Sequence, residues 1–224
     1  MHPTQDDLTA DYGESCAEFY DEIYRSVDPG VLSRLQELAA GGRVLELGLG
    51  TGRVALPLAA RGVDISGIEA SKSMVARLRQ KPGGDRIKVV EGNFAEGGIA
   101  GSFSLVFAVV STFFLQRSRA EQQRCFDAVA RLLTTEGVFL MENFEPSGAM
   151  SDERDKQFYR TEQTVQTSKG PREYRVQICY SSPQQLDEMA RKAGLRLKDR
   201  WSNWRGQTYK PGEPLHVSLY EHRR

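Results

Sequence analysis

The chain has 224 residues, which is enough for one domain with a substantial core or for a domain with a small cap. Lysine plus arginine and aspartate plus glutamate are equal at 30 each, so no net field favours nucleic acid or an acidic membrane surface. The three cysteines and three histidines are scattered without ligand-like spacing, which argues against a disulfide framework and against a metal site.

No apolar segment approaches the ~20 residues of a membrane span. The N-terminal stretch "MHPTQDDLTADYGESC" is polar and acidic, which predicts neither a signal peptide nor a transit peptide. We therefore expect a cytoplasmic protein with reduced thiols and with no nucleic acid, membrane or metal partner.

In chain order, the sequence first predicts helices. Apolar residues recur at helical spacing over residues 14–38 and are interrupted at 28–30, so we expect two helices there. Strands and helices are then expected to alternate, with strands at 43–47, 63–70, 86–93, 103–111 and 137–144, and helices at 51–62, 71–81 and 119–133. Because these strands are almost continuously apolar, they predict a parallel sheet covered on both faces. Ser71 is the expected N-cap of its helix, and Pro57 requires an early helical position or a kink.

The pattern changes after Phe144. Residues 145–174 are polar and strand-poor, and we interpret them as a flexible insertion or a cap. A strand at 175–180, a helix at 182–194 and a strand at 196–204 follow. Residues 215–223 alternate between apolar and polar, which predicts an edge strand.

Residues 44–53, "VLELGLGTGR", place glycines at 48, 50 and 52 directly after the first strand, where doubly wound sheets bind ligands. A dinucleotide site requires GxGxxG, but the sixth position counted from Gly48 is Arg53. A phosphate loop fails as well, because no Gly-Lys-Ser/Thr follows. Glu46 would repel a pyrophosphate and suits a ligand that carries its own ammonium group.

S-adenosylmethionine (SAM) is such a ligand, since it has an α-amino group, an α-carboxylate and no phosphate. The helix that begins near Thr51 offers free N–H groups to the carboxylate, and Glu46 attracts the ammonium directly or through water. A tight glycine turn with no ligand is the alternative interpretation.

Two more strand ends favour SAM. Glu69 ends the second strand, 21 residues after Gly48, where an acidic side chain can accept from both ribose hydroxyls. Asn93 follows the third strand, where it can bind the adenine edge while Phe94 or Met74 packs against the ring. The alternatives are an exposed glutamate without a role at Glu69 and a turn-forming asparagine at Asn93.

With these residues in place, the chain resembles the class I SAM-dependent methyltransferases, in particular a bacterial branch that acts on small molecules. The similar segments are residues 44–87, the stretch "STFFLQRSRAEQQRCFDAVARLL" and the ending "HVSLYEHR". The resemblance implies an α/β, Rossmann-like, doubly wound sheet of seven strands in the order 3-2-1-4-5-7-6, with strand 7 antiparallel. It also implies a single domain, composed of an N-terminal helical lid (1–40), a SAM-binding core (41–144 and 176–224) and a short cap (145–175).

The resemblance further implies a set of site residues. In this family, aromatic residues of the N-terminal helices close over the methionine part of SAM, and Tyr12, Tyr20 and Tyr24 resemble them. The alternative interpretation is that these tyrosines form a helix packing face. The predicted cofactor-binding residues are Tyr12, Tyr20, Glu46, Gly48, Gly50, Gly52, Arg53, Glu69, Ala70, Met74, Asn93, Phe94 and Val110. The cap is shorter than we expect for the family, so it is reduced, partly disordered, or completed by a second subunit in a homodimer.

Methyl transfer requires alignment of the nucleophile with the methyl carbon, and it requires a base only if the acceptor loses a proton as it attacks. Glu142 and Tyr24 are the candidate catalytic residues, although Glu142 could instead cap a turn or pair with an arginine. The candidate acceptor-binding residues are Ser111, Thr112, Asn143, Tyr159, Trp204 and Arg205. His216 lies in a strand-like stretch and is interpreted as structural.

We therefore expect an enzyme that transfers a methyl group from SAM to an oxygen or nitrogen of a small-molecule acceptor, with secondary metabolism as its expected setting. An amino-sugar or amino-acid N-methyltransferase is one alternative. A SAM-binding protein without transferase activity is the other.

Overall fold

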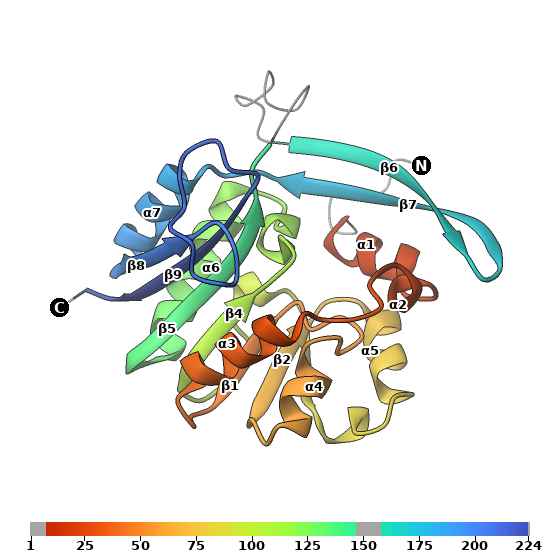
Figure 1. The fold of residues 1–224 in the computed structure, drawn as a ribbon, viewed down its shortest axis with the longest axis horizontal. Coiled ribbons are helices and arrows are strands. Elements are labelled where there is room, and N and C mark those ends of the chain that lie inside the picture. The colour runs from red at the N-terminus through yellow and green to blue at the C-terminus, as the bar shows by residue number, and fades with distance from the viewer. Residues whose placement is uncertain (1–7, 147–157, 224) are drawn as a thin grey trace.

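A seven-stranded sheet in the order β3-β2-β1-β4-β5-β9-β8 runs through the middle of the molecule (Figure 1). The computed structural model describes residues 8–146 and 158–223. The sheet strands are β1 (Val44–Leu47), β2 (Ile65–Glu69), β3 (Lys88–Glu91), β4 (Phe103–Ala108), β5 (Leu133–Phe144), β8 (Leu195–Trp201) and β9 (Leu215–His222). β1 to β5 pair in parallel, and β9 is antiparallel to both of its neighbours. The expected order and the antiparallel seventh strand are confirmed.

Helices cover both faces of the sheet, as the apolar strands predict. Every residue of β1 and of β2 is buried. The helices on one face are α3 (Pro29–Ala39), α4 (Ala55–Ala60) and α5 (Lys72–Arg79). Those on the other face are α6 (Arg119–Leu132) and α7 (Pro183–Lys192).

Local signals in the sequence set where several helices begin. Ser71 caps α5, because its hydroxyl accepts the Met74 N–H at 3.1 Å. Pro57 is the third residue of α4, where a helical N–H has no partner to lose. Three short 3-10 helices connect the larger elements: η1 (Gly84–Arg86), η2 (Phe94–Glu96) and η3 (Thr112–Leu115).

The N-terminal region forms three helices instead of the expected two. They are α1 (Leu8–Cys16), α2 (Tyr20–Ile23) and α3. Asp28 begins α3, since its carboxylate accepts the Gly30 N–H at 2.6 Å and Pro29 takes the first helical position. The break that the sequence predicted at 28–30 is therefore the start of a helix, and the extra break lies between α1 and α2.

The prediction that residues 215–223 form an edge strand is wrong, because β9 lies between β5 and β8. All residues from His216 to Tyr220 are buried. The two polar residues in this stretch bind each other, with His216 Nδ1 and Ser218 Oγ 2.8 Å apart. A buried polar pair on one face therefore imitated the alternation of an exposed edge.

The prediction that residues 145–174 are strand-poor is also wrong for the described part of that range, and residues 147–157 lie outside the described residues. Strands β6 (Phe158–Thr167) and β7 (Gly170–Cys179) form a long antiparallel hairpin with a sheet of its own. In Figure 1 the hairpin extends over the sheet's upper end and reaches the region of α1 and α2. It is two-faced, since alternate residues point toward the protein and toward solvent. The polar outward residues concealed the strand pattern from a composition-based assignment.

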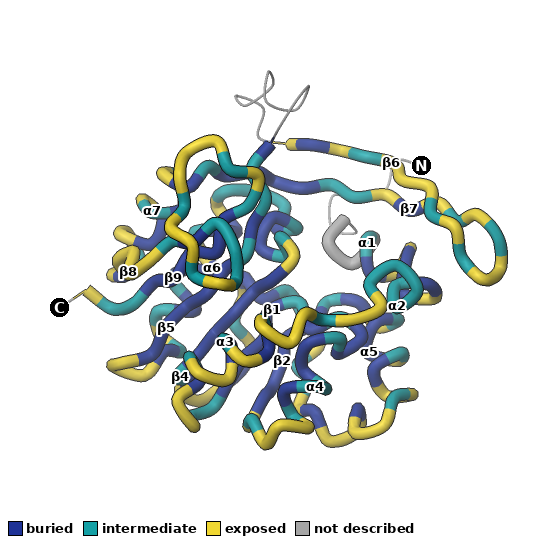
Figure 2. Tube along the Cα trace, in the orientation of Figure 1, coloured by how far each residue is buried: buried dark blue, intermediate teal, exposed yellow. Residues whose placement is uncertain are grey.

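Burial follows this architecture. Figure 2 shows buried residues concentrated along the central strands and exposed residues along β6 and at the tip of the hairpin. Within the described ranges, no helix combines the length and apolar character that crossing a bilayer requires. Among those same residues, no group of three or more histidine, cysteine, aspartate or glutamate side chains is arranged to hold a metal ion.

Candidate functional site

The glycine turn after β1 has three glycines with positive φ, +69° at Gly48, +59° at Gly50 and +77° at Gly52. A Cβ on Gly48 would overlap Thr112 Cγ2, and a Cβ on Gly52 would overlap Leu78 Cδ1. A Cβ on Gly50 would meet nothing within 4 Å. Two of the glycines are therefore needed for packing within the protein, and Gly50 alone borders open space that a ligand can enter.

Glu69 fastens the glycine turn to the next strand. Its Oε2 accepts the Gly50 N–H at 2.7 Å, and its Oε1 accepts the Ser71 N–H at 2.8 Å. Burial raises the pKa of the Glu69 carboxyl above its ordinary value, and the backbone donors at Ser71 and Gly50 oppose part of that shift. Each carboxylate oxygen has a second lone pair, so this geometry leaves room for the predicted contact with ribose.

Glu46 and Arg53 bring opposite charges together beneath the turn. Glu46 is 3% exposed, and its Oε2 has no hydrogen-bond partner among the described residues. Burial raises the pKa of Glu46 well above its ordinary value, while the charge of Arg53 opposes the shift. The Nε of Arg53 is likewise buried without a partner in the part of the chain that the structure describes. A zwitterionic ligand would satisfy both atoms, because an ammonium pairs with a carboxylate and a carboxylate pairs with a guanidinium.

The other predicted cofactor residues lie around the ends of β2 and β3. Asn93 Oδ1 accepts the Ala95 N–H at 2.9 Å and caps η2, so the turn-forming role occupies the atom that was expected to bind adenine. Phe94 and Met74 are buried, and Ala70 is half-buried between Glu69 and the start of α5. These positions surround the glycine turn as expected, but their contact with a ligand stays a prediction.

Polar contacts fasten the N-terminal helices over the turn. Asp21 Oδ1, in α2, accepts from Thr51 Oγ1 at 2.6 Å and from Lys81 Nζ at 2.8 Å. Lys81 Nζ also donates to the Thr51 carbonyl at 2.8 Å. Glu14, in α1, accepts from the Ser71 hydroxyl at 2.8 Å. The helices that carry Tyr12 and Tyr20 are thus held against the same turn that carries Gly50.

A cavity of about 330 Å³ lies between these helices, the end of β4 and the hairpin. Its size is that of a pocket for one small molecule. The residues around it are Tyr12, Tyr20, Tyr24, Val110, Ser111, Thr112, Leu115, Phe144, Tyr159, Thr161, Gln163, Tyr174, Val176 and Ile178. Five of the fourteen are tyrosines and none carries a charge.

The hairpin contributes to this cavity through one face only. Its lining residues alternate along each strand and face one another in three cross-strand pairs, which are Tyr159–Ile178, Thr161–Val176 and Gln163–Tyr174. Gln163 Oε1 accepts from the Tyr174 hydroxyl at 2.8 Å. The Thr161 hydroxyl is buried and has no partner among the described residues.

The turn after β4 is strained. Val110 and Ser111 both have positive φ, +55° and +57°, which is a genuine outlier for a β-branched valine. Glu142 stabilises this turn, since its Oε2 accepts the Val110 N–H at 2.7 Å and its backbone carbonyl accepts the Ser111 N–H at 2.9 Å. Trp204 Nε1 donates to the other carboxylate oxygen at 2.8 Å.

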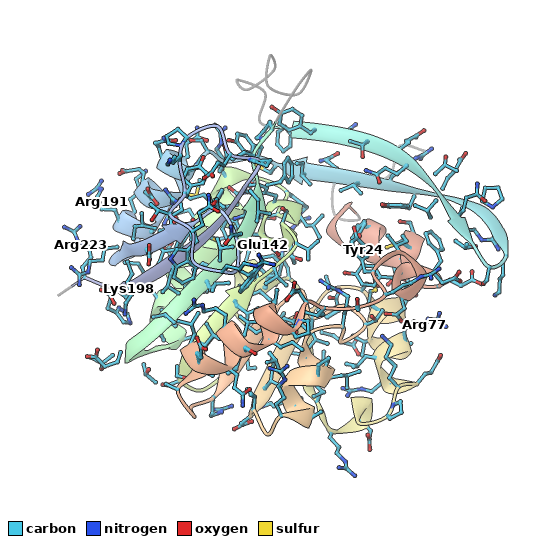
Figure 3. The ribbon with its side chains drawn as sticks, in the orientation of Figure 1. Tyr24, Arg77, Glu142, Arg191, Lys198 and Arg223 are labelled. Atoms are coloured by element: carbon cyan, nitrogen blue, oxygen red, sulfur yellow. The ribbon has the colours of Figure 1, made fainter. Side chains whose placement is uncertain are left out.

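Both oxygens of Glu142 therefore have protein partners, and the residue does not line the cavity. Figure 3 shows Glu142 over the central strands and Tyr24 beside α2. Tyr24 does line the cavity, with the Arg53 guanidinium 5.7 Å from its ring centroid.

Three of the expected acceptor-binding residues, Ser111, Thr112 and Tyr159, lie on the cavity wall. The other three do not. Asn143 is 0% exposed and lies within β5, opposite His216, while Arg205 is exposed and Trp204 contacts Glu142. Asn143 does not line the cavity because successive strand residues point to opposite faces of the sheet, and its neighbour Phe144 is the one that faces it.

Sequence reasoning missed the hairpin wall formed by Thr161, Gln163, Tyr174, Val176 and Ile178. A signal for half of it was present, because "YRVQICY" alternates apolar and polar residues from Tyr174 onward. The Thr161 and Gln163 side had no such signal, since both positions are polar.

Comparison with known proteins places the chain among methyltransferases. A family model described as a methyltransferase domain matches residues 44–137. The chain is 31% identical over 173 residues to an uncharacterized methyltransferase of Geobacillus thermodenitrificans, covering 73% of each chain. It is 28% identical over 141 residues to the cypemycin N-terminal methyltransferase of a Streptomyces species, which covers 61% of this chain and only 57% of that relative's length. The solved structure of the CcbJ methyltransferase from Streptomyces caelestis is similar, with a TM-score of 0.85, 30% identity and coverage of 96% of this chain and 99% of that one.

Proposed function

The chain belongs to the class I SAM-dependent methyltransferases, and we propose that it transfers a methyl group from SAM to an amine nitrogen of a small molecule. The observation that carries the choice of nitrogen is the composition of the cavity wall, whose described residues include no histidine, aspartate, glutamate or lysine. The size of the cavity, about 330 Å³, supports a small acceptor over one of macromolecular size.

The residues of the glycine turn suit the cofactor. Glu46 would hold its ammonium and Arg53 its carboxylate, which gives a partner to each of the two buried atoms that lack one. Gly50 would allow close approach to the backbone, and Glu69 would contact the ribose. When bound, SAM supplies a methyl carbon that is activated by a positively charged sulfur.

A nitrogen acceptor needs less from the protein than an oxygen acceptor does. The nitrogen lone pair forms the new N–C bond as the C–S bond breaks, the electron pair of that bond stays on sulfur, and the methylated nitrogen then releases its proton to water. A hydroxyl must lose its proton during attack, which requires a base within hydrogen-bond reach. Among the described residues that line the cavity there is no histidine, aspartate, glutamate or lysine. Burial raises the pKa of Tyr12 and of Tyr20, so these phenols stay protonated at neutral pH.

Glu142 is then a positioning residue. Its carboxylate accepts from the Val110 backbone and from the Trp204 indole, which together hold a strained turn at the cavity wall. Such a turn keeps Val110 and Ser111 at fixed positions beside the reacting groups, and alignment of this kind can lower a barrier by ~7–11 kcal/mol. The cypemycin enzyme, whose name specifies an N-terminus as its site of methylation, supports a nitrogen acceptor independently.

The proposal can be tested by methyl transfer from radiolabelled SAM to matched pairs of amines and alcohols, such as benzylamine and benzyl alcohol or tyramine and 4-hydroxyphenylethanol. We expect label only in the amine of each pair, together with S-adenosylhomocysteine (SAH) in equal amount. Transfer to the alcohols at a comparable rate would contradict the choice of nitrogen. SAM binding without turnover on any acceptor would favour a binding protein without transferase activity.

A further inference from the structure

We infer that the acceptor is an amine with an aromatic or apolar body that carries no carboxylate or phosphate, and that the uncharged inner face of the β6–β7 hairpin selects it. This inference rests on the proposed function and adds the class of acceptor to it. Free amino acids and phosphorylated amines are excluded by the same argument.

Along the stretch that lines the cavity, the hairpin separates charged from uncharged residues by face. The inward residues of this stretch form the three cross-strand pairs of the cavity wall. Apart from the two tyrosine phenols, none of these side chains is ionisable. Its outward residues on the same strands are charged, as the pair Arg175–Glu162 shows at 2.8 Å. Over the three pairs that line the cavity, arginine and glutamate stand only on the outward face; the next pair on the inward face, Val165–Arg172, lies outside the cavity lining.

The charged groups nearest the cavity are already engaged. Glu142 lies behind Val110, where its two oxygens accept from the Val110 N–H and from Trp204. Arg53 lies beside the Tyr24 ring and donates through Nη1 to the Ser26 carbonyl at 3.3 Å. Its buried Nε, which has no partner among the described residues, belongs to the cofactor site in the proposed function. An acceptor carboxylate would therefore be buried without a cationic partner, which is costly.

The cavity wall suits an amine with an aromatic or apolar body. Tyrosine rings from the N-terminal helices and from the hairpin provide apolar surface for the body of the acceptor. The faces of these rings also attract the positive charge that forms on nitrogen as it gains the methyl group. Tyr12 and Tyr174 are already paired, with ring centroids 5.9 Å apart. The Thr161 hydroxyl is buried and lacks a partner among the described residues, so it can bind one neutral polar group on the acceptor.

Three probes that share a ring and an amine separate charge from bulk. Tyramine has no substituent at the carbon next to the amine, tyrosinamide has a neutral amide there, and tyrosine has a carboxylate. Each is titrated calorimetrically into the protein loaded with SAH. We expect tyramine and tyrosinamide to bind and tyrosine to bind at least tenfold more weakly than tyrosinamide. Tyrosine binding as tightly as tyrosinamide, or binding of none of the three, would overturn the inference.

A pair of variants provides the matched test of location. Gln163 and Thr164 are adjacent on β6, both are exposed, and only Gln163 lines the cavity. Gln163→Arg should reduce the preference for tyrosinamide over tyrosine at least threefold, because it places a guanidinium at the cavity wall. Thr164→Arg adds the same charge to the outer face and should leave the preference unchanged. An equal effect of the two variants, or no effect of Gln163→Arg, would contradict selection by the inner face.

The outcome for the proposed function is read separately. Methyl transfer from labelled SAM to the nitrogen of tyrosine, at a rate equal to that for tyrosinamide, would preserve amine methylation and overturn this inference. Transfer only to alcohols would overturn the proposed function itself.

Discussion

Glu69 Oε2 accepts the backbone N–H of Gly50 at 2.7 Å, and this contact joins the end of β2 to the only glycine of the turn that borders open space. The same carboxylate reaches the Ser71 N–H at the start of α5. One buried side chain therefore fixes the backbone on two sides of the proposed cofactor site before any ligand binds, which would reduce the ordering cost of binding.

Removal of that carboxylate should weaken cofactor binding. We expect Glu69→Ala to lower the affinity for SAH by about 10- to 100-fold, because a hydrogen bond to an ionised acceptor contributes about 1.5–3 kcal/mol. Glu91→Ala is the matched control, since Glu91 is the register partner of Glu69 on β3 and is exposed. Calorimetric titration with SAH measures both variants, and parent-like affinity in a folded Glu69→Ala would show that the carboxylate has no part in the site.

Gly48→Ala and Gly50→Ala should differ in their effects on stability and on SAH binding. Gly48→Ala and Gly50→Ala both force alanine into a left-handed conformation, which costs about 1–2 kcal/mol. Gly48→Ala also overlaps Thr112, which adds about 1–3 kcal/mol of destabilisation, whereas Gly50→Ala meets no protein atom. Urea denaturation should therefore find Gly48→Ala the less stable. Calorimetry should find a loss of SAH affinity, about tenfold or more, in Gly50→Ala even where it is fully folded, and normal SAH binding by that variant would argue against ligand approach at this position.

Glu142 distinguishes positioning from base catalysis. Glu142→Gln should lower the free energy of unfolding by about 1–3 kcal/mol, because an amide cannot accept from both Val110 and Trp204. We expect its kcat to fall while the shape of the pH–rate profile stays the same. Trp204→Phe retains the carboxylate but removes one donor, so it should lower kcat in the same direction. A base would behave otherwise, since Glu142→Gln would then remove the acidic limb of the profile and Trp204→Phe would retain near-normal turnover.

His216 should make the protein sensitive to acid. Burial lowers its pKa from 6.5 to about 3, with the charge of Arg200 contributing. Between these values the unfolded chain binds a proton that the folded chain does not, so stability falls as pH drops from 6.5 toward 3, by up to about 1.4 kcal/mol per pH unit.

His216→Asn removes this titration while it preserves a polar atom near Ser218. The difference in unfolding free energy between parent and variant, measured in urea at pH 7, 6, 5 and 4, should therefore shift steadily in favour of the variant. A difference that is constant with pH would show that the histidine does not titrate with an altered pKa.

The central sheet could be predicted because β1, β2, β4 and β5 each contain a largely apolar run, and the glycine turn identified the first strand. The position of β9 needed the family resemblance, since its buried polar pair gave the pattern of an edge. The β6–β7 hairpin could not be predicted in full, because its outward face is charged and its inward face mixes tyrosine with threonine and glutamine.

The candidate site, too, could be predicted from the sequence only in part. Glu46 lies in β1, Gly50 follows β1 and Glu69 ends the neighbouring strand β2, so their proximity could be predicted. Glu142 and Trp204 are 62 positions apart and meet only because β9 and β8 return beside β5. No local pattern in the sequence indicates such a contact, so the sequence predicts a base at Glu142 and a pocket wall at Trp204.

Calorimetric titration of the purified protein with SAM and SAH, with ATP and NADH as controls, tests the central claim most directly. The account predicts roughly micromolar binding of SAM and SAH alone. A zwitterionic ligand would pair with the buried Glu46 Oε2 and Arg53 Nε, which have no partner among the described residues, and Glu46 would repel a phosphate. Absence of SAM binding by the folded protein, or tighter binding of ATP or NADH, would contradict it.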